Sequence, residues 1–142
     1  SNYIDYTLLK PSTTEREIIE LCKDAKINGF FSVCVNSCYV ALAKQLLLES
    51  KVKVCTVVGF PLGAMSTKSK VFEAEKAIED ANINPEELDY IIVASNYGDV
   101  KHGNTQCDTV PSMASRIKHL LRIQNPSCVA YDLLFGCPDG TH

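Results

Sequence analysis

The fold follows from one apolar stretch, Val52-Lys53-Val54-Cys55-Thr56-Val57-Val58-Gly59-Phe60-Pro61-Leu62-Gly63, which ends at glycine and proline. Apolar and β-branched runs of this length are typical of strands in parallel sheets that helices cover. We therefore expect a buried strand here, near the middle of the chain's alternating strands and helices. The polar segment 64–80 that follows has the spacing of a covering helix.

Strand and helix patterns alternate along the 142 residues. Strands are expected at 3–9, 30–35, 52–58, 88–94 and 128–134, and helices are expected after the capping segments 12–14, 36–37 and 66–67 and after residue 111. The pattern predicts a single α/β domain over residues 1–142. It would hold four to five mainly parallel strands with helices packed on them, as a half-barrel or an open three-layer sandwich.

Composition excludes several classes of protein. Hydrophobic residues make up 46% of the chain, charged residues 22%, and the net charge is -3. These values predict a globular protein, with no basic excess for nucleic acid and no apolar run long enough to span a membrane.

The cysteines are odd in number and scattered, so no disulfide framework is expected. Cys34 and Cys38 lack a second ligand pair, and we predict neither a metal site nor a cofactor. We expect the thiols to be small buried groups in a cytoplasmic protein. The seven are Cys22, Cys34, Cys38, Cys55, Cys107, Cys128 and Cys137.

The first half of the chain carries three specific motifs, at residues 4–11 (IDYTLLKP), 32–36 (SVCVN) and 52–63. With these motifs the segment of about 3–80 resembles deoxyribose-phosphate aldolase, a class I aldolase with a TIM-barrel fold. The resemblance covers the first three strand-helix units of an eight-unit barrel. It implies carbon-carbon lyase chemistry through a Schiff-base lysine.

The aldolase resemblance also implies roles for individual residues. Substrate-binding positions would be Asp5, Thr7, Cys34 and Asn36, which we expect at the C-terminal ends of strands, where barrels carry their chemistry. Asp89 would match the proton-transferring aspartate. The family's Schiff-base lysine lies on later strands that the resemblance does not include.

The second half carries different motifs, at residues 77–94 and 131–137. Here the segment of about 74–138 is similar to condensing enzymes of the ketoacyl-ACP synthase III type, which have a thiolase fold. That resemblance implies a nucleophilic thiol at Cys137. Together the two resemblances predict a chimera, joined within residues 74–81.

Three functions remain open at this stage. The first is a recombinant α/β domain without a complete active site, and therefore no enzyme. The second is an aldolase-like lyase with residual carbonyl chemistry, and the third is an acyl-thioester-reactive module that uses Cys137.

Two binding properties are also expected. The turn with Gly59, Gly63 and Ser66 could bind a small phosphate or sulfate through backbone N–H groups. Apolar surface and open sheet edges predict a homo-oligomer, most simply a dimer.

Overall fold

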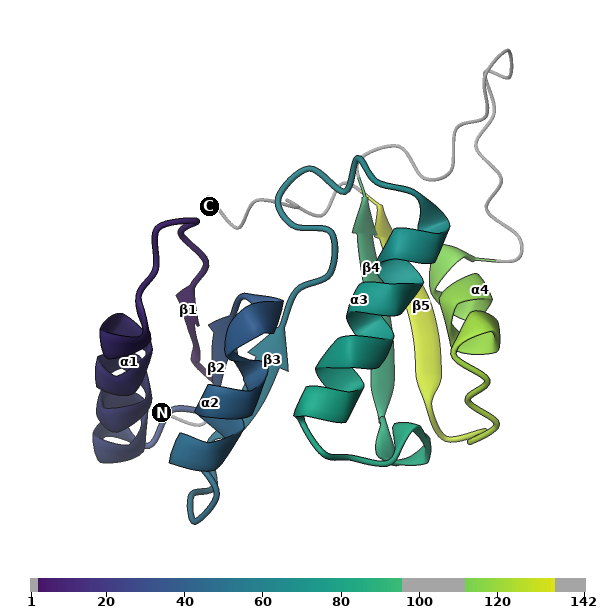
Figure 1. Ribbon diagram of the computed structural model, residues 1–142. Coiled ribbons are helices and arrows are strands. Elements are labelled where there is room, and N and C mark those ends of the chain that lie inside the picture. Colours follow the sequence, from purple (N-terminus) through teal and green to yellow (C-terminus); the bar gives the residue numbers. More distant parts are fainter. Residues whose placement is uncertain (1–2, 96–111, 135–142) are drawn as a thin grey trace. The chain divides into compact units, whose positions relative to one another are not determined.

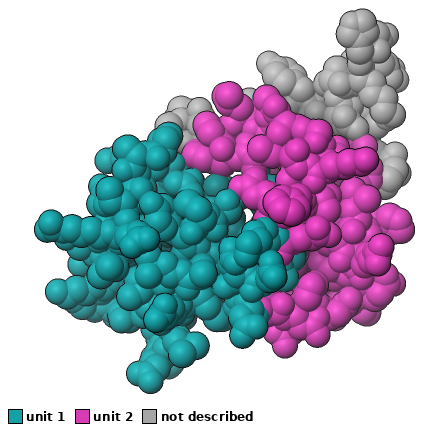
Figure 2. Space-filling model, in the orientation of Figure 1, with its two compact units in different colours: residues 1–58, 76–82 teal, residues 59–75, 83–142 magenta. Residues whose placement is uncertain are grey.

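The computed structural model describes residues 3–95 and 112–134, which are shown in Figure 1. The chain divides into two compact units. The first unit comprises residues 1–58 and 76–82, and the second comprises residues 59–75 and 83–142 (Figure 2). No helix among the described residues is long and apolar enough to cross a membrane.

Strands and helices alternate as the sequence predicts, and every strand pair is parallel. The α/β fold is therefore confirmed. The elements are β1 (Asp5–Leu8), α1 (Glu15–Asn28), β2 (Ser32–Val35), the 3-10 helix η1 (Ser37–Tyr39), α2 (Val40–Leu46), β3 (Lys53–Thr56), α3 (Thr67–Asp80), the 3-10 helix η2 (Pro85–Glu87), β4 (Tyr90–Ser95), α4 (Met113–Leu120) and β5 (Val129–Leu134).

The first unit is built on a three-stranded sheet in the order β1-β2-β3. Val33 and Val35 on β2 pack into one core with Ile18 of α1 and Ala43 of α2. Both helices therefore cover the same face of the sheet, as the helices of a barrel do, whereas a three-layer sandwich has helices on both faces. Among the described strands this sheet is open, because β1 and β3 each pair with β2 alone.

The strand predicted at 52–58 is less buried than expected. All four residues of β2 are buried, whereas Lys53 at the start of β3 is exposed and Val54, Cys55 and Thr56 are half-buried. The middle strand of this sheet is thus β2, and β3 lies at an edge of the described sheet. An apolar run indicates a strand in a covered sheet but does not distinguish a middle strand from an edge strand.

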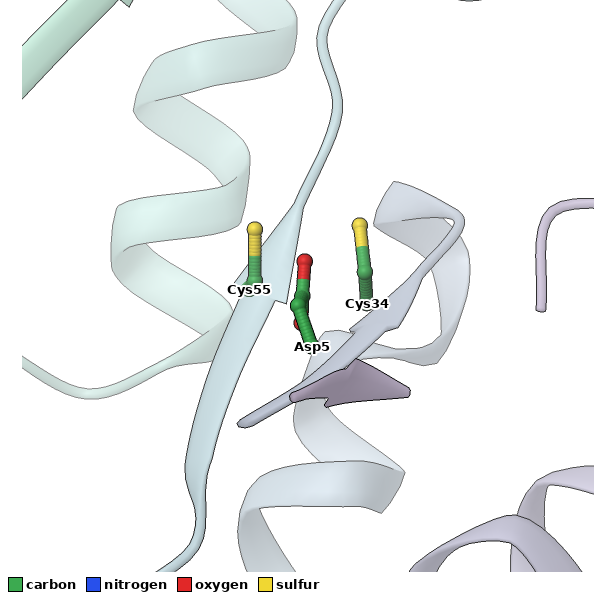
Figure 3. A group of neighbouring side chains, drawn as sticks. All are labelled: Asp5, Cys34 and Cys55. Carbon is green, nitrogen blue, oxygen red and sulfur yellow. The ribbon is translucent and has the colours of Figure 1, made fainter. Parts of the chain in front are cut away.

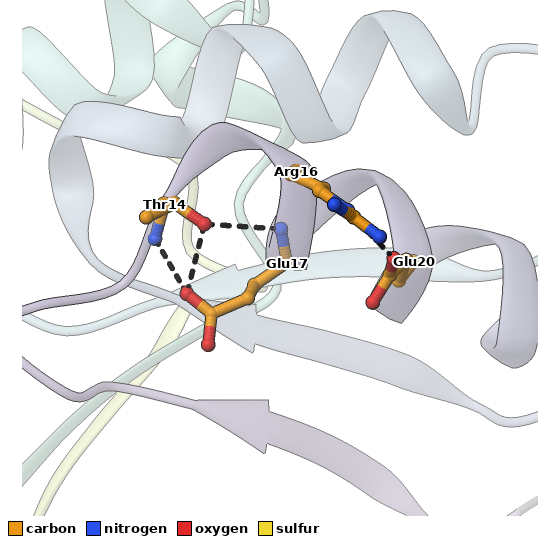
Figure 4. A network of polar contacts seen from close by, with 4 residues as sticks. All are labelled: Thr14, Arg16, Glu17 and Glu20. Carbon is orange, nitrogen blue, oxygen red and sulfur yellow. Dashed lines mark hydrogen bonds and ion pairs between the residues drawn. The ribbon is translucent and has the colours of Figure 1, made fainter.

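Helix α1 is fixed at both ends by local contacts. The Thr14 hydroxyl accepts a hydrogen bond from the Glu17 N–H, and the Glu17 carboxylate accepts one from the Thr14 N–H at 2.8 Å (Figure 4). At the other end Gly29 adopts the left-handed conformation, with φ of 60°. This reciprocal N-terminal capping and the C-terminal glycine confirm the boundaries read from the sequence.

The second unit contains a parallel pair, β4 and β5, with α4 packed on both strands. The Asp132 carboxylate of β5 accepts hydrogen bonds from the backbone N–H groups of Met113 and Ala114, both at 2.8 Å. Near the other end of α4, the Lys118 ammonium donates to the Asn125 and Cys128 carbonyls, both at 2.7 Å. These contacts set both ends of the helix against its sheet.

A second polar cluster ties η2 to the segment before β5. The Glu86 carboxylate accepts hydrogen bonds from the N–H groups of Gln124 at 2.8 Å and Asn125 at 2.6 Å. The Asn125 side-chain amide donates to the Glu86 carbonyl at 2.8 Å. Three hydrogen bonds therefore join segments that are almost forty residues apart in sequence.

Candidate functional site

The face of the first sheet that α1 and α2 leave free carries polar and nucleophilic side chains. In the parallel register Asp5 lies beside Ser32, which lies beside Lys53. The next row on the same face is Thr7, Cys34 and Cys55. Side chains two residues apart on a strand share a face, so these two rows form one polar surface.

Asp5 is held over the sheet by its neighbour on β2. The Ser32 hydroxyl donates a hydrogen bond of 2.7 Å to Oδ1 of Asp5, and Ser32 is itself buried. One part of the prediction for Asp5 is wrong, because it is the first residue of β1 rather than a C-terminal strand residue. The strand begins two residues later than the alternating pattern suggests, because Tyr3 and Ile4 lie outside it.

Cys34 and Cys55 form a thiol pair beside Asp5. Their Sγ atoms and a carboxylate oxygen of Asp5 all lie within 4.8 Å of one another, and the three side chains point to the same side of the sheet (Figure 3). Cys34 is 5% exposed. Its hydrogen bond to Cys55, its burial and the nearby Asp5 charge raise the pKa of the Cys34 thiol, whereas accepting that bond lowers the pKa of Cys55.

The other two predicted substrate positions lie close to this pair. Thr7 is the register partner of Cys34, and its hydroxyl donates to the Asp5 carbonyl at 3.2 Å. Asn36 follows β2 directly, and its amide donates to the Lys10 carbonyl at 3.3 Å. Asn36 is the N-cap residue of η1, within the capping segment that the sequence predicts, but its side chain makes no capping hydrogen bond to that helix.

The predicted anion-binding turn lies in the second unit. The Gly59 N–H donates to the Glu73 carboxylate at 2.8 Å, and the Gly63 N–H donates to the Gly59 carbonyl at 2.6 Å. The Ser66 hydroxyl accepts from the Ser69 N–H at 3.2 Å, which confirms its role as a helix cap. Anion binding at this turn stays a prediction, and the two glycine N–H groups already have protein acceptors.

The two residues predicted to be catalytic are not part of this polar surface. Asp89 is an exposed residue just before β4 in the second unit, and its carbonyl accepts from the Val129 N–H at 2.8 Å. Cys137 lies outside the described residues. The roles predicted for both remain untested.

Two residues of the polar surface, Ser32 and Cys55, were given no site role at the sequence level. Both lie within the motifs at 32–36 and 52–63 that carry the aldolase resemblance. Once the strands are taken as parallel, the alternation of side chains places Ser32 with Cys34 and Lys53 with Cys55. The signal was therefore present, but its use required the register between strands.

Comparison with known proteins identifies aldolases as relatives. No family model matches the chain. The chain is 52% identical over 106 residues to deoxyribose-phosphate aldolase of Clostridium botulinum (strain Langeland), and 47% identical over 106 residues to that of Ureaplasma urealyticum serovar 10. Each match covers 75% of this chain, and it covers 47% and 46% of the two relatives. The chain thus spans about half the length of the curated relatives that it matches.

Solved structures that are similar to this chain are also aldolases. The tetrameric deoxyribose-phosphate aldolase from Aeropyrum pernix matches with a TM-score of 0.56 and 30% identity, over 66% of this chain and 37% of that protein. An aldolase called QR15 matches with a TM-score of 0.55 and 39% identity, over 66% of this chain and 38% of that protein.

The length of the curated match bears on the predicted chimera. Any stretch of 106 residues in a chain of 142 includes residues 37–106. The predicted junction at 74–81 therefore lies inside the stretch that matches aldolases. The comparisons give no support to a condensing-enzyme component.

Proposed function

We propose that this chain forms part of an aldolase of the deoxyribose-phosphate type, a carbon-carbon lyase, rather than a non-catalytic domain. The observation that carries the proposal is the polar sheet surface, on which carboxyl, hydroxyl, thiol and amine groups lie in register. In barrels the sheet face away from the helices is a packed interior, and substrates bind at the C-terminal ends of the strands. By resemblance, Asp5, Thr7, Cys34 and Asn36 would bind the substrate. Cys34 lies near the C-terminal end of β2, and Asn36 follows that strand directly, whereas Asp5 is the first residue of β1.

Class I aldol cleavage requires an amine that attacks the substrate carbonyl and expels water to give an iminium ion. Breaking the carbon-carbon bond then sends its electron pair toward the iminium nitrogen, while a base takes the hydroxyl proton. Lys53 is the lysine found within the described strands, and it lies on the same surface as Asp5. Two strand spacings, about 10 Å, separate their backbones, with Ser32 between them.

Because the family's Schiff-base lysine lies on later strands, we test Lys53 as a substitute amine, and we test Asp89 as a base because the resemblance gives it that role. The full chain is incubated with deoxyribose 5-phosphate, and acetaldehyde release is followed with alcohol dehydrogenase and NADH. Parallel samples receive acetaldehyde and borohydride, and the reduced adduct is located by peptide mass spectrometry. Lys53→Ala and Asp89→Asn are compared with Lys51→Ala, which removes a neighbouring exposed lysine.

We expect slow turnover and an adduct on the Lys53 peptide, both lost in Lys53→Ala and retained in Lys51→Ala. Turnover, but not the adduct, should be lost in Asp89→Asn. No adduct above background, or an adduct spread evenly over the lysines, would favour the non-catalytic domain. Separate samples are incubated with an acyl thioester, and an adduct on Cys137 in those samples would favour the thioester-reactive alternative.

We also infer that the chain assembles with copies of itself. The Aeropyrum pernix relative is described as tetrameric, and the large exposed apolar side chains include Tyr3, Phe72 and Leu62. A dimer is the simplest form of such an assembly. A monomer mass from light scattering at micromolar concentration would contradict the inference.

A further inference from the structure

We propose that Asp5, Cys34 and Cys55 form a binding site for a thiophilic divalent cation, with Zn²⁺ as the best-suited ion. The three residues come from three adjacent strands, β1, β2 and β3. One ligand atom from each lies within 4.8 Å of the other two. The proposal depends on this geometry and stands whether or not the chain cleaves carbon-carbon bonds.

The separations suit tetrahedral zinc. Zinc binds thiolate sulfur at about 2.3 Å and carboxylate oxygen at about 2.0–2.2 Å, so neighbouring ligand atoms of a tetrahedron lie about 3.4–3.8 Å apart. The atoms here need to approach one another by at most about 1 Å to meet that requirement. Such a change is within reach of side-chain rotation, because all three side chains already point to the same side of the sheet (Figure 3).

The surroundings of the ligands also suit a metal. The Ser32 hydroxyl holds Oδ1 of Asp5 at 2.7 Å, which fixes the carboxylate as hydrogen bonds around metal sites commonly do. Cys34 is buried, whereas Asp5 is exposed, so a cation can enter from the carboxylate side. Three protein ligands leave a fourth position for water, the arrangement found in open zinc sites.

The ligand set is selective. Two thiolates favour zinc and other thiophilic ions over magnesium and calcium, which require oxygen ligands. Binding removes the thiol protons, so two protons leave Cys34 and Cys55 for each cation bound. Zn²⁺ has no redox chemistry, and the step needs neither an oxidant nor a reductant.

The test uses the full chain, reduced and freed of metal with a chelator. Co²⁺ is added as a spectroscopic probe, thiolate-to-cobalt charge-transfer absorbance is recorded, and Zn²⁺ affinity is measured by competition with a chromophoric chelator. The variants are Cys34→Ser, Cys55→Ser and Asp5→Asn. The matched control combines Cys38→Ser, Cys107→Ser and Cys137→Ser, which removes thiols outside the proposed site.

We expect one Zn²⁺ per chain, retained in the control. Each cysteine variant should abolish the thiolate absorbance or weaken Zn²⁺ binding at least about tenfold, since even residues around a metal's direct ligands contribute 10- to 100-fold. Asp5→Asn, an exposed substitution that leaves the core intact, should weaken binding while retaining the thiolate band. The proposal is overturned by binding that survives both single cysteine variants, by binding lost in the control, or by no thiolate band in the parent protein.

Discussion

The carboxylate of Asp132 offers the sharpest test of how the second unit holds together. Its two oxygens each accept a 2.8 Å hydrogen bond, from the N–H groups of Met113 and Ala114 at the start of α4. Hydrogen bonds to charged groups contribute about 1.5–3 kcal/mol each, and water will partly replace them at a helix end. We therefore expect Asp132→Ala to lower the free energy of unfolding by about 2–4 kcal/mol.

Asp132→Asn is the informative companion because it keeps one acceptor oxygen and loses the charge. It should cost about half as much as Asp132→Ala. Ser112→Ala, which removes the hydroxyl that accepts from the Ser115 N–H at 3.1 Å, is a matched control for ordinary capping and should cost about 1 kcal/mol. Urea unfolding followed by circular dichroism measures all three. The reasoning would be refuted if Asp132→Ala lowered the free energy of unfolding by less than about 0.5 kcal/mol. Equal losses in the alanine and asparagine variants would also refute it, because both carboxylate oxygens are argued to contribute.

Two further outcomes follow from the first unit. Ile18 is fully buried, so Ile18→Ala should lower the free energy of unfolding in urea by about 2–5 kcal/mol. The side chain of Ile19 is 47% exposed, so Ile19→Ala should lower it far less. Similar losses at both positions would contradict the core described here. The hydrogen bond from the Thr14 backbone N–H, and then the bond from the Thr14 hydroxyl, lower the pKa of Glu17. The ionised carboxylate therefore stabilises the fold at pH values above the unfolded pKa of Glu17. This contribution is lost as the pH falls through the lowered pKa of the folded state. The thermal stability of the parent should therefore exceed that of Glu17→Gln at neutral pH and approach it below pH 4.5, and a difference independent of pH would count against this capping role.

Much of the fold could be predicted because its signals are local. Thr14, Glu17 and Gly29 define α1 through contacts within a few residues, which sequence spacing reveals directly. The order of the strands in the sheet could not be predicted, because no local signal in the sequence determines it. Whether the strand with Val33 or the one with Val54 lies in the middle depends on pairing between distant segments, and both strands are rich in β-branched residues.

In the candidate site, too, the locally signalled features were predicted and the contacts between distant segments were not. Asp5 and Cys34 were chosen from motifs, and the structure brings them together. Cys55 was treated as a core thiol because no short-range spacing links it to Cys34, 21 residues earlier. Asn36 lies at the predicted cap position, but its hydrogen bond to the Lys10 carbonyl, 26 residues away in sequence, could not be inferred from local spacing. Sequence spacing therefore predicts which single residues could take part in a site, but not which residues from distant segments lie beside them.

The cluster around Glu86 has a consequence for the order in which the second unit forms. Closing a loop of nearly forty residues costs at least about 3 kcal/mol in chain entropy, which is close to what its three hydrogen bonds can return. The cluster is therefore not expected to persist in the unfolded chain before β4 and β5 have paired. Contacts made after the rate-limiting step govern how fast a protein opens rather than how fast it folds. We accordingly expect Glu86→Ala to speed unfolding more than it slows folding.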